Sequence, residues 1–429
     1  MDLVELKKRF EGCECGRAHG FDLEVLEISS GAIFRVGEIL KKGNFPKRIL
    51  LVADENSFRV TSGLYERLLG EGYTVELRVY ESTKVADMEK VKEIEVLLQR
   101  VDGCLSVGTG SVNDVCRLAS YNVDKPFAIV ATAPSMDGFA SDSAPITTGF
   151  FKTSHYCRQP KIIIADTKIL AEAPVELKAA GFGDVIAKYI AVADWRIAKM
   201  LHNGDNYCDR VVQLVRDALA KMVALAGKVR ENSEEAAGAI METLVLTGLA
   251  MQLVRSSRAA SGTEHIISHF WECKKLTEGK ISDYHGKKVG VATLVVAKAY
   301  HNLTKIDKVK AHRENPDWED IKAHYGDKLS DDMMKLNLPH TIVQEIEPAL
   351  IEEKWEEIKQ VIKDEIPPYE TLLDLYKKAG AAITGEDIAV SDELFEEGIK
   401  YHIYMRRRVT IARILPMLDL SLFDLYKQD

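Results

Sequence analysis

The chain has 429 residues, 46% of them hydrophobic, so it is long enough for two or three domains with apolar cores. Its 57 basic and 66 acidic residues give a net charge of −9, which argues against a nucleic acid partner but allows a small phosphorylated substrate in a locally basic pocket. The chain has no signal-peptide pattern, no apolar run of about 20 residues, and seven cysteines that are mostly isolated, so we expect a cytoplasmic protein without a membrane partner.

Strands and helices alternate between residues 22 and 170. Residues 88–101 have helical spacing. Apolar runs predict strands at 48–53, 103–107, 127–132 and 161–166, and residues 74–80 alternate like a strand. Such alternation is typical of βαβ units around a largely parallel sheet. The ligand of such a sheet lies beyond the carboxyl ends of its strands.

The pattern becomes helical after Pro174. Apolar stripes with a 3.6-residue period predict helices at 176–200, 210–230, 234–256, 262–278 and 287–303. A charged helical region follows at 305–400, and a last apolar helix is predicted at 401–418. We therefore predict an α/β domain at 1–173 and an all-helical domain at 174–429.

A glycine-rich turn separates the third predicted strand from a helix. Gly108, Gly110 and Ser111 form the turn, and Asn113 and Asp114 begin the helix. This arrangement can bring backbone N–H groups to a pyrophosphate. The turn lacks the third glycine of the common dinucleotide fingerprint, so the motif alone is weak evidence.

Asp54 follows the first apolar strand. An acid there can accept hydrogen bonds from the adenosine ribose, and it would repel the 2′-phosphate of NADP, which modestly favours NAD. The alternative is a solvent-facing acid at the end of a strand. Both NAD and NADP therefore stay candidate cofactors.

Three segments place an acid or an imidazole in helix-forming sequence. Asp184 is predicted to open a helix, His265 and His269 share one helix face, and His285 lies beside a turn. Asp184, His265 and His285 would give one carboxylate and two imidazoles, a set that suits a divalent metal with an open position. The alternative is an N-cap aspartate with ordinary buried histidines.

Several motifs occur together in a specific order. Residues 108–111, 132–138, 184–188 and 257–265, followed by Tyr284-His285-Gly286, resemble the sn-glycerol-1-phosphate dehydrogenases, especially the bacterial AraM-type members. These belong with iron-containing alcohol dehydrogenases, glycerol dehydrogenases and dehydroquinate synthases. The resemblance implies an N-terminal Rossmann-like domain, a C-terminal helical domain and a cleft between them that holds cofactor and metal. It implies one metal per subunit, usually zinc with nickel or iron as alternatives, held by Asp184, His265 and His285.

The resemblance also implies roles for other side chains. The glycine turn would bind the cofactor phosphates, and loop residues Thr132, Ser135 and Ser141 would bind elsewhere along the cofactor. The catalytic groups would be His269, Lys188 and Asp137, and the substrate would contact these three residues and Arg258. Arginine suits phosphate because it makes bidentate contacts. The alternatives are an ion pair of Lys188 with Asp184 and a buried His269 bonded to backbone.

The implied activity is metal-dependent interconversion of dihydroxyacetone phosphate and sn-glycerol 1-phosphate with NAD(P)H. The alternatives are a glycerol dehydrogenase, a dehydroquinate-synthase-like enzyme, or a degenerate protein that binds sugar phosphates. The apolar helical half favours a homodimer or a higher homo-oligomer.

A short tract near the N-terminus contains Cys13, Cys15 and His19. It resembles part of a metal site, but a structural zinc site needs a fourth ligand, and none follows at a conventional spacing. The sequence therefore assigns these residues no site.

Overall fold

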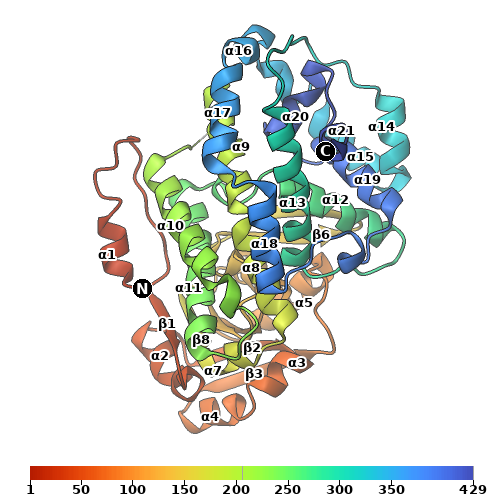
Figure 1. The fold of residues 1–429 in the computed structure, drawn as a ribbon. Helices are drawn as coiled ribbons and strands as arrows, with labels where there is room; N and C mark the ends of the chain where they lie inside the picture. Colours follow the sequence, from red (N-terminus) through yellow and green to blue (C-terminus); the bar gives the residue numbers. More distant parts are fainter. Residues whose placement is uncertain (205, 429) are drawn as a thin grey trace.

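The structure is a computed structural model that describes residues 1–204 and 206–428 (Figure 1). A six-stranded sheet with the order β1-β8-β5-β4-β2-β3 occupies the N-terminal part. All five pairings between its neighbouring strands are parallel, which confirms the predicted parallel sheet. The strands are β1 (Val25–Ser29), β2 (Arg48–Asp54), β3 (Thr74–Tyr80), β4 (Gly103–Gly108), β5 (Phe127–Ala131) and β8 (Ile162–Asp166).

Both faces of this sheet are covered. Along β2, Leu50 and Val52 belong to one apolar cluster, whereas Ile49 and Leu51 belong to another. Successive side chains of a strand point to opposite faces, so these clusters lie on opposite faces of the sheet. Helices supply many of the other residues in both clusters, as expected for a parallel sheet. Those between the strands are η1 (Ala32–Arg35), α2 (Val36–Lys42), α3 (Glu55–Val60), α4 (Leu64–Gly70), α5 (Met88–Leu98) and α6 (Gly110–Asn122).

An antiparallel ribbon between β5 and β8 was not predicted from the sequence. Its strands are β6 (Ser143–Thr148) and β7 (Phe151–Tyr156), and the short helix η2 (Gly138–Ala140) precedes it. Lys152 in β7 forms an ion pair of 2.9 Å with Glu272, which lies in a helix of the C-terminal part. The ribbon therefore joins the sheet half to the helical half.

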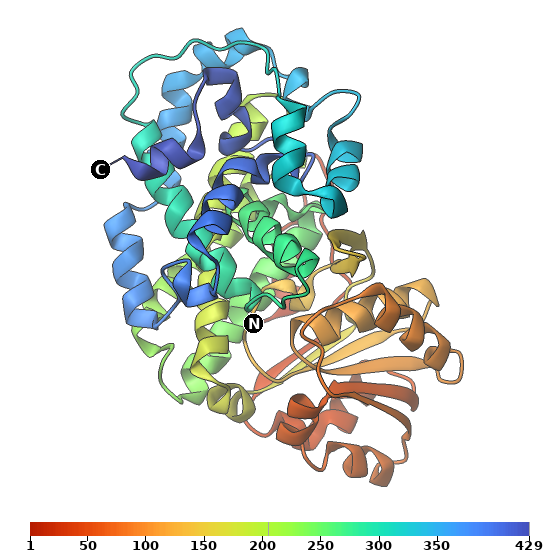
Figure 2. The same ribbon diagram turned by 90° about the vertical axis from the view of Figure 1, so that its right-hand side faces the viewer.

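Beyond β8, every regular element that the structure describes is helical, which confirms the predicted helical C-terminal part (Figure 2). The division at residues 173 and 174 stays a prediction. The first helices are α7 (Thr167–Glu172), α8 (Val175–Ile186), α9 (Lys188–Met200), α10 (Asp209–Leu225), η3 (Ala226–Lys228), α11 (Glu234–Val254), η4 (Ser257–Ala259), α12 (Thr263–Thr277) and α13 (His285–Leu303).

The charged region contains further helices, also as predicted. They are α14 (Trp318–Tyr325), α15 (Asp327–Asn337), η5 (Ile342–Glu345), α16 (Pro348–Glu353), α17 (Trp355–Glu365), α18 (Tyr369–Ala379), η6 (Glu386–Ile388) and α19 (Asp392–Tyr401). The single helix predicted at 401–418 is wrong. The segment forms η7 (His402–Tyr404), α20 (Ile411–Ile414) and η8 (Leu415–Leu418), because the Arg406–Arg408 stretch between them leaves the helical path and bonds to distant segments. The last helix is α21 (Leu422–Lys427).

The helix α11 is long and apolar enough to cross a membrane by length and composition. However, 89% of its most apolar window is buried inside the fold. It packs against α10, α7 and η2, so it links the helical half to the loop that follows β5. This environment is that of a core helix.

Candidate active site

Two helices approach each other closely beside the predicted metal ligands. A Cβ on Gly286 in α13 would lie 2.0 Å from the carbonyl oxygen of Ala180 in α8. A Cβ on Gly183 would lie 2.7 Å from the carbonyl oxygen of Gly286. Glycine alone fits at both positions. These glycines precede Asp184 and follow His285, so the close approach brings those two side chains together.

The three predicted ligands converge. One ligand atom each from Asp184, His265 and His285 lies within 4.8 Å of the others. The Nε2 atom of His265 is 3.5 Å from Oδ1 of Asp184, and the rings of His265 and His285 are 5.2 Å apart. A carboxylate oxygen and two imidazole nitrogens at this spacing fit one divalent metal ion and leave room for a further ligand.

The position of Asp184 within its helix differs from the prediction. Asp184 lies in the last turn of α8 and does not open a helix, so the alternative of an N-cap aspartate is excluded. The reason is that the preceding glycines are part of α8, where they allow close packing, and do not interrupt it. The side chain is fully buried.

Asp184 is held as an anion. Its Oδ2 accepts a hydrogen bond of 2.8 Å from the backbone N–H of Asp137, and its Oδ1 lies 3.3 Å from Nζ of Lys188. Burial alone would raise the pKa of the Asp184 carboxyl, but opposing interactions, of which the Lys188 charge is the largest, hold that pKa well below its ordinary value. A charged, buried carboxylate is a suitable oxygen ligand for a divalent cation.

A carboxylate that the sequence analysis missed orients His265. Oε1 of Glu264 lies 2.6 Å from Nδ1 of His265 and also accepts the backbone N–H of Gly262 at 2.8 Å. Because a carboxylate accepts, Nδ1 carries the proton, and Nε2 is the nitrogen that a metal ion could bind. This arrangement fixes a metal-ligating imidazole and raises its basicity. The signal in the sequence was an acid directly before the histidine in an apolar helix.

His285 is neutral and has a free nitrogen. Burial lowers the pKa of His285 to about 3. Its Nδ1 atom is buried and has no hydrogen-bond partner within residues 1–204 and 206–428. A buried nitrogen without a partner is costly, and coordination of a metal by this ring would offset that cost.

Lys188 is fully buried and lies between two carboxylates. Its Nζ is 2.6 Å from Oδ2 of Asp137 and 3.3 Å from Oδ1 of Asp184. The ion pair given above as the alternative is thus present, and two negative charges already balance this cation. Because Asp137 belongs to the loop after β5, Lys188 also ties that loop of the sheet half to the helix that carries Asp184.

His269 lies beside the ligands, as predicted. Its ring stacks on that of His285 with 5.6 Å between centroids. Its Nδ1 is buried and lacks a hydrogen-bond partner in the described part of the chain, so the alternative of a backbone bond at this atom is not seen. Burial, reinforced by Arg406 and Lys152, lowers the pKa of His269 well below its ordinary value. The ring is therefore neutral.

Arg258, predicted to contact the substrate, makes hydrogen bonds within the protein. Its guanidinium donates to the carbonyl oxygen of Val409 at 3.1 Å and to Oδ1 of Asn203 at 3.2 Å. By contrast, Arg406 has a buried Nη2 without a hydrogen-bond partner among the residues described, and it lies near enough to His269 to lower its pKa. The sequence analysis missed Arg406 because it lies more than 100 residues beyond the metal motifs.

The predicted glycine turn is present. β4 ends at Gly108, and α6 begins at Gly110 after Thr109, whose side chain does not cap the helix. The first N–H groups of a helix have no intrahelical partner, so those of Gly110 and Ser111 are available to an anion.

Other predicted cofactor residues make contacts within the protein. Asn113 accepts the hydroxyl of Ser106 at 2.6 Å, and Asp114 pairs with Arg117 at 3.1 Å while burial raises the pKa of Asp114 to about 6. Asp54 caps α3 through the N–H of Ser57. Thr132, Ser135 and Ser141 are buried in the loop after β5.

The fold and the ligand set define a class of metal-dependent dehydrogenase. The sequence model of the iron-containing alcohol dehydrogenase family matches residues 27–174. A probable glycerol dehydrogenase from Sinorhizobium meliloti has a TM-score of 0.61 at 16% identity and covers 96% of this chain and 97% of its own. An NADH-dependent butanol dehydrogenase from Thermotoga maritima has a TM-score of 0.62 at 14% identity, and the match covers 95% of this chain and 98% of the butanol dehydrogenase. These structures share the fold.

Relatives that are similar in sequence identify the family within this class of dehydrogenases. A glycerol-1-phosphate dehydrogenase (NAD(P)+) from Halalkalibacterium halodurans is 30% identical over 421 residues, which are 96% of this chain and 97% of the relative. Another with the same name, from Methanoregula boonei, is 35% identical over 62% of this chain and 71% of the relative. The chain belongs to the glycerol-1-phosphate dehydrogenase family, as the motifs predicted. It is an oxidoreductase that uses a nicotinamide cofactor and a metal ion.

Proposed function

We propose that the protein interconverts dihydroxyacetone phosphate and sn-glycerol 1-phosphate with NAD(H) or NADP(H), and that its metal is zinc. The convergence of Asp184, His265 and His285 supports this proposal, because a chain whose relatives are named glycerol-1-phosphate dehydrogenase also contains a set of metal ligands. An intact ligand set argues against a degenerate binding protein. The homo-oligomer and the cytoplasmic location stay predictions.

The residues of this chain prepare the site. Lewis-acid stabilisation of a developing alkoxide is the chemistry that a divalent metal supplies with such ligands. Lys188 and the N–H of Asp137 hold Asp184, and Glu264 holds His265 in the tautomer that coordinates through Nε2. These contacts fix the ligands before the substrate binds, so little reorganisation is needed during the reaction.

Different groups of the chain would transfer the proton and bind the cofactor. His269 is neutral, buried and free at Nδ1, so it can exchange a proton with the substrate oxygen. The N–H groups at the start of α6 would bind the cofactor pyrophosphate, and the loop that contains Asp137 would lie near the nicotinamide.

The substrate phosphate needs a cation that no other group neutralises. Lys188 does not meet this requirement, because two carboxylates balance it. Arg258 is less suited to bind a phosphate, because its guanidinium already donates to Val409 and Asn203. Arg406 has a buried guanidinium nitrogen without a partner in the described chain and lies near the proposed proton carrier. We therefore assign the phosphate to Arg406.

The test compares two substrates in two variants. Arg406→Gln should lower kcat/KM for dihydroxyacetone phosphate by about 10–100-fold and change kcat/KM for dihydroxyacetone much less, since a hydrogen bond to a charged group contributes about 1.5–3 kcal/mol. Arg407→Gln is the matched control, because Arg407 is exposed and pairs with Glu345. Equal losses on both substrates would overturn the phosphate assignment. If neither variant nor the wild type distinguished the substrates, a glycerol dehydrogenase would be favoured.

A further inference from the structure

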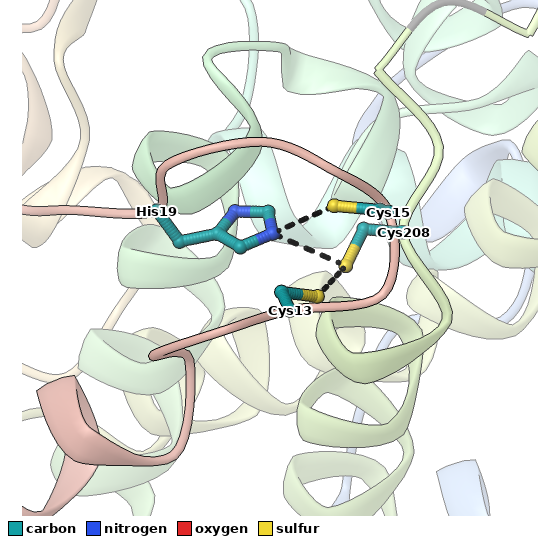
Figure 3. A group of neighbouring side chains, drawn as sticks. All are labelled: Cys13, Cys15, His19 and Cys208. Carbon is teal, nitrogen blue, oxygen red and sulfur yellow. Dashed lines mark hydrogen bonds between the residues drawn. The ribbon is translucent and has the colours of Figure 1, made fainter.

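A second group of ligand-type side chains lies between the N-terminal segment and α10 (Figure 3). Cys13, Cys15 and His19 come from the loop after α1 (Leu3–Lys8), and Cys208 immediately precedes α10. One ligand atom from each of the four lies within 4.8 Å of the others. All four side chains therefore point toward one common centre.

The fold supplies the fourth ligand that the sequence tract lacked. Cys208 is 189 residues beyond His19 in the chain, yet its Sγ lies 3.4 Å from Nε2 of His19. The same sulfur lies 3.5 Å from Sγ of Cys13, and Sγ of Cys15 lies 3.0 Å from Nε2 of His19. Local spacing in the sequence therefore could not identify Cys208 as the fourth ligand.

We propose that Cys13, Cys15, His19 and Cys208 form a structural metal site that binds one zinc ion. Zinc bonds of about 2.3 Å to sulfur and about 2.0–2.1 Å to nitrogen place the ligand atoms of a tetrahedral site roughly 3.5–3.8 Å apart. The contacts of 3.0, 3.4 and 3.5 Å in the structure are close to this spacing. Three thiolates and one imidazole leave no open position, which is typical of structural zinc.

A backbone contact fixes the imidazole in the form that can coordinate. Nδ1 of His19 lies 2.5 Å from the carbonyl oxygen of Leu253 near the end of α11. A carbonyl can only accept, so Nδ1 carries the proton and the lone pair of Nε2 faces the sulfurs. A partner of this kind on the second ring nitrogen is common for metal-ligating histidines.

A disulfide is the main alternative for these cysteines. A bond between Cys13 and Cys208 would involve only two of the four side chains. It would not explain why Cys15 and His19 lie beside them. The metal site explains all four. It would attach the loop of residues 9–20, which forms no helix or strand, to α10 and α11.

Cobalt substitution of the full-length wild-type protein gives the first test. Cobalt bound by thiolates has an intense sulfur-to-metal charge-transfer absorption, which the Asp184 site cannot produce because it contains no sulfur. We expect this band in wild-type protein and in His265→Ala, together with two bound metals per wild-type chain. Absence of the band under reducing conditions would overturn the proposal, whether or not the protein is an active dehydrogenase.

Variants provide the second test. Cys15→Ser should lose one metal per chain and weaken or shift the charge-transfer band, whereas Cys157→Ser should lose neither. Cys157 is the matched control, because it is likewise a partly buried free cysteine but lies outside the cluster. Undiminished metal content in Cys15→Ser would contradict the site. A protein isolated two hydrogens lighter, with Cys13 linked to Cys208, would establish the disulfide instead. If Cys15→Ser fails to fold, the wild-type cobalt spectrum and metal content still decide.

Discussion

Replacing Glu264 with glutamine tests whether the metal ligands are oriented by their neighbours. Glu264 is fully buried, and its Oε1 accepts from Nδ1 of His265 at 2.6 Å and from the N–H of Gly262 at 2.8 Å. Glutamine keeps an accepting oxygen but removes the charge. A charged hydrogen bond contributes about 1.5–3 kcal/mol and a neutral one about 0.5–1.5, so the loss is about 1–2 kcal/mol. Metal affinity should therefore fall by about 5–30-fold.

The assay measures recovered activity of metal-free protein at a series of buffered free zinc concentrations. Activity reports the Asp184 site, and a control variant accounts for any effect of refilling a structural metal site elsewhere. The midpoint should move to higher zinc in Glu264→Gln and stay unchanged in Glu365→Gln. Glu365 is the control, because it is also a buried carboxylate but pairs with Arg196 and Arg216. An unmoved midpoint in Glu264→Gln, or an equal shift in both variants, would refute the reasoning.

Three further predictions concern Gly286, Lys188 and Asp114. Gly286→Ala should abolish activity and reduce metal content, because its Cβ would lie 2.0 Å from a backbone oxygen of α8, whereas Gly227→Ala has open space and should change neither. Lys188→Met should lower the free energy of unfolding in urea by about 3–5 kcal/mol, because it leaves two buried carboxylates unpaired; an unchanged urea midpoint would contradict this. Burial raises the pKa of Asp114 from 3.8 to about 6, so the native state binds the extra proton between these values and stability should fall as pH rises from about 4 to 6. The difference in stability between wild type and Asp114→Asn should follow that window and stay constant above it, and a difference independent of pH would show that Asp114 is ionised throughout.

The sequence predicted the features that depend on local pattern. Apolar runs bounded by turn residues located β2, β4, β5 and β8, because a buried strand in a parallel sheet must be apolar on both faces. The edge strand β3 was located by its alternating pattern. Two glycines in the sequence, Gly108 and Gly110, predicted the turn between β4 and α6. Asp184, His265 and His285 were found because their motifs resembled a known family, since spacing alone left an ordinary N-cap and buried histidines as alternatives.

Long-range packing determined what the sequence could not predict. Lys188 meets Asp137 only because α9 packs beside the loop after β5, so its double ion pair had no signal in the chain. Arg406 and Cys208 reach their clusters from segments distant in sequence, and helical periodicity even predicted a continuous helix through Arg406. Local propensity therefore failed where several side chains bond to separate parts of the molecule.

The most direct measurement is turnover by the purified, zinc-loaded protein with dihydroxyacetone phosphate and NADH or NADPH, followed by determination of the product configuration. The account predicts oxidation of the cofactor, sn-glycerol 1-phosphate as the product, and loss of turnover in His285→Ala together with loss of one metal. Exclusive formation of the opposite enantiomer, or full turnover by His285→Ala, would contradict it.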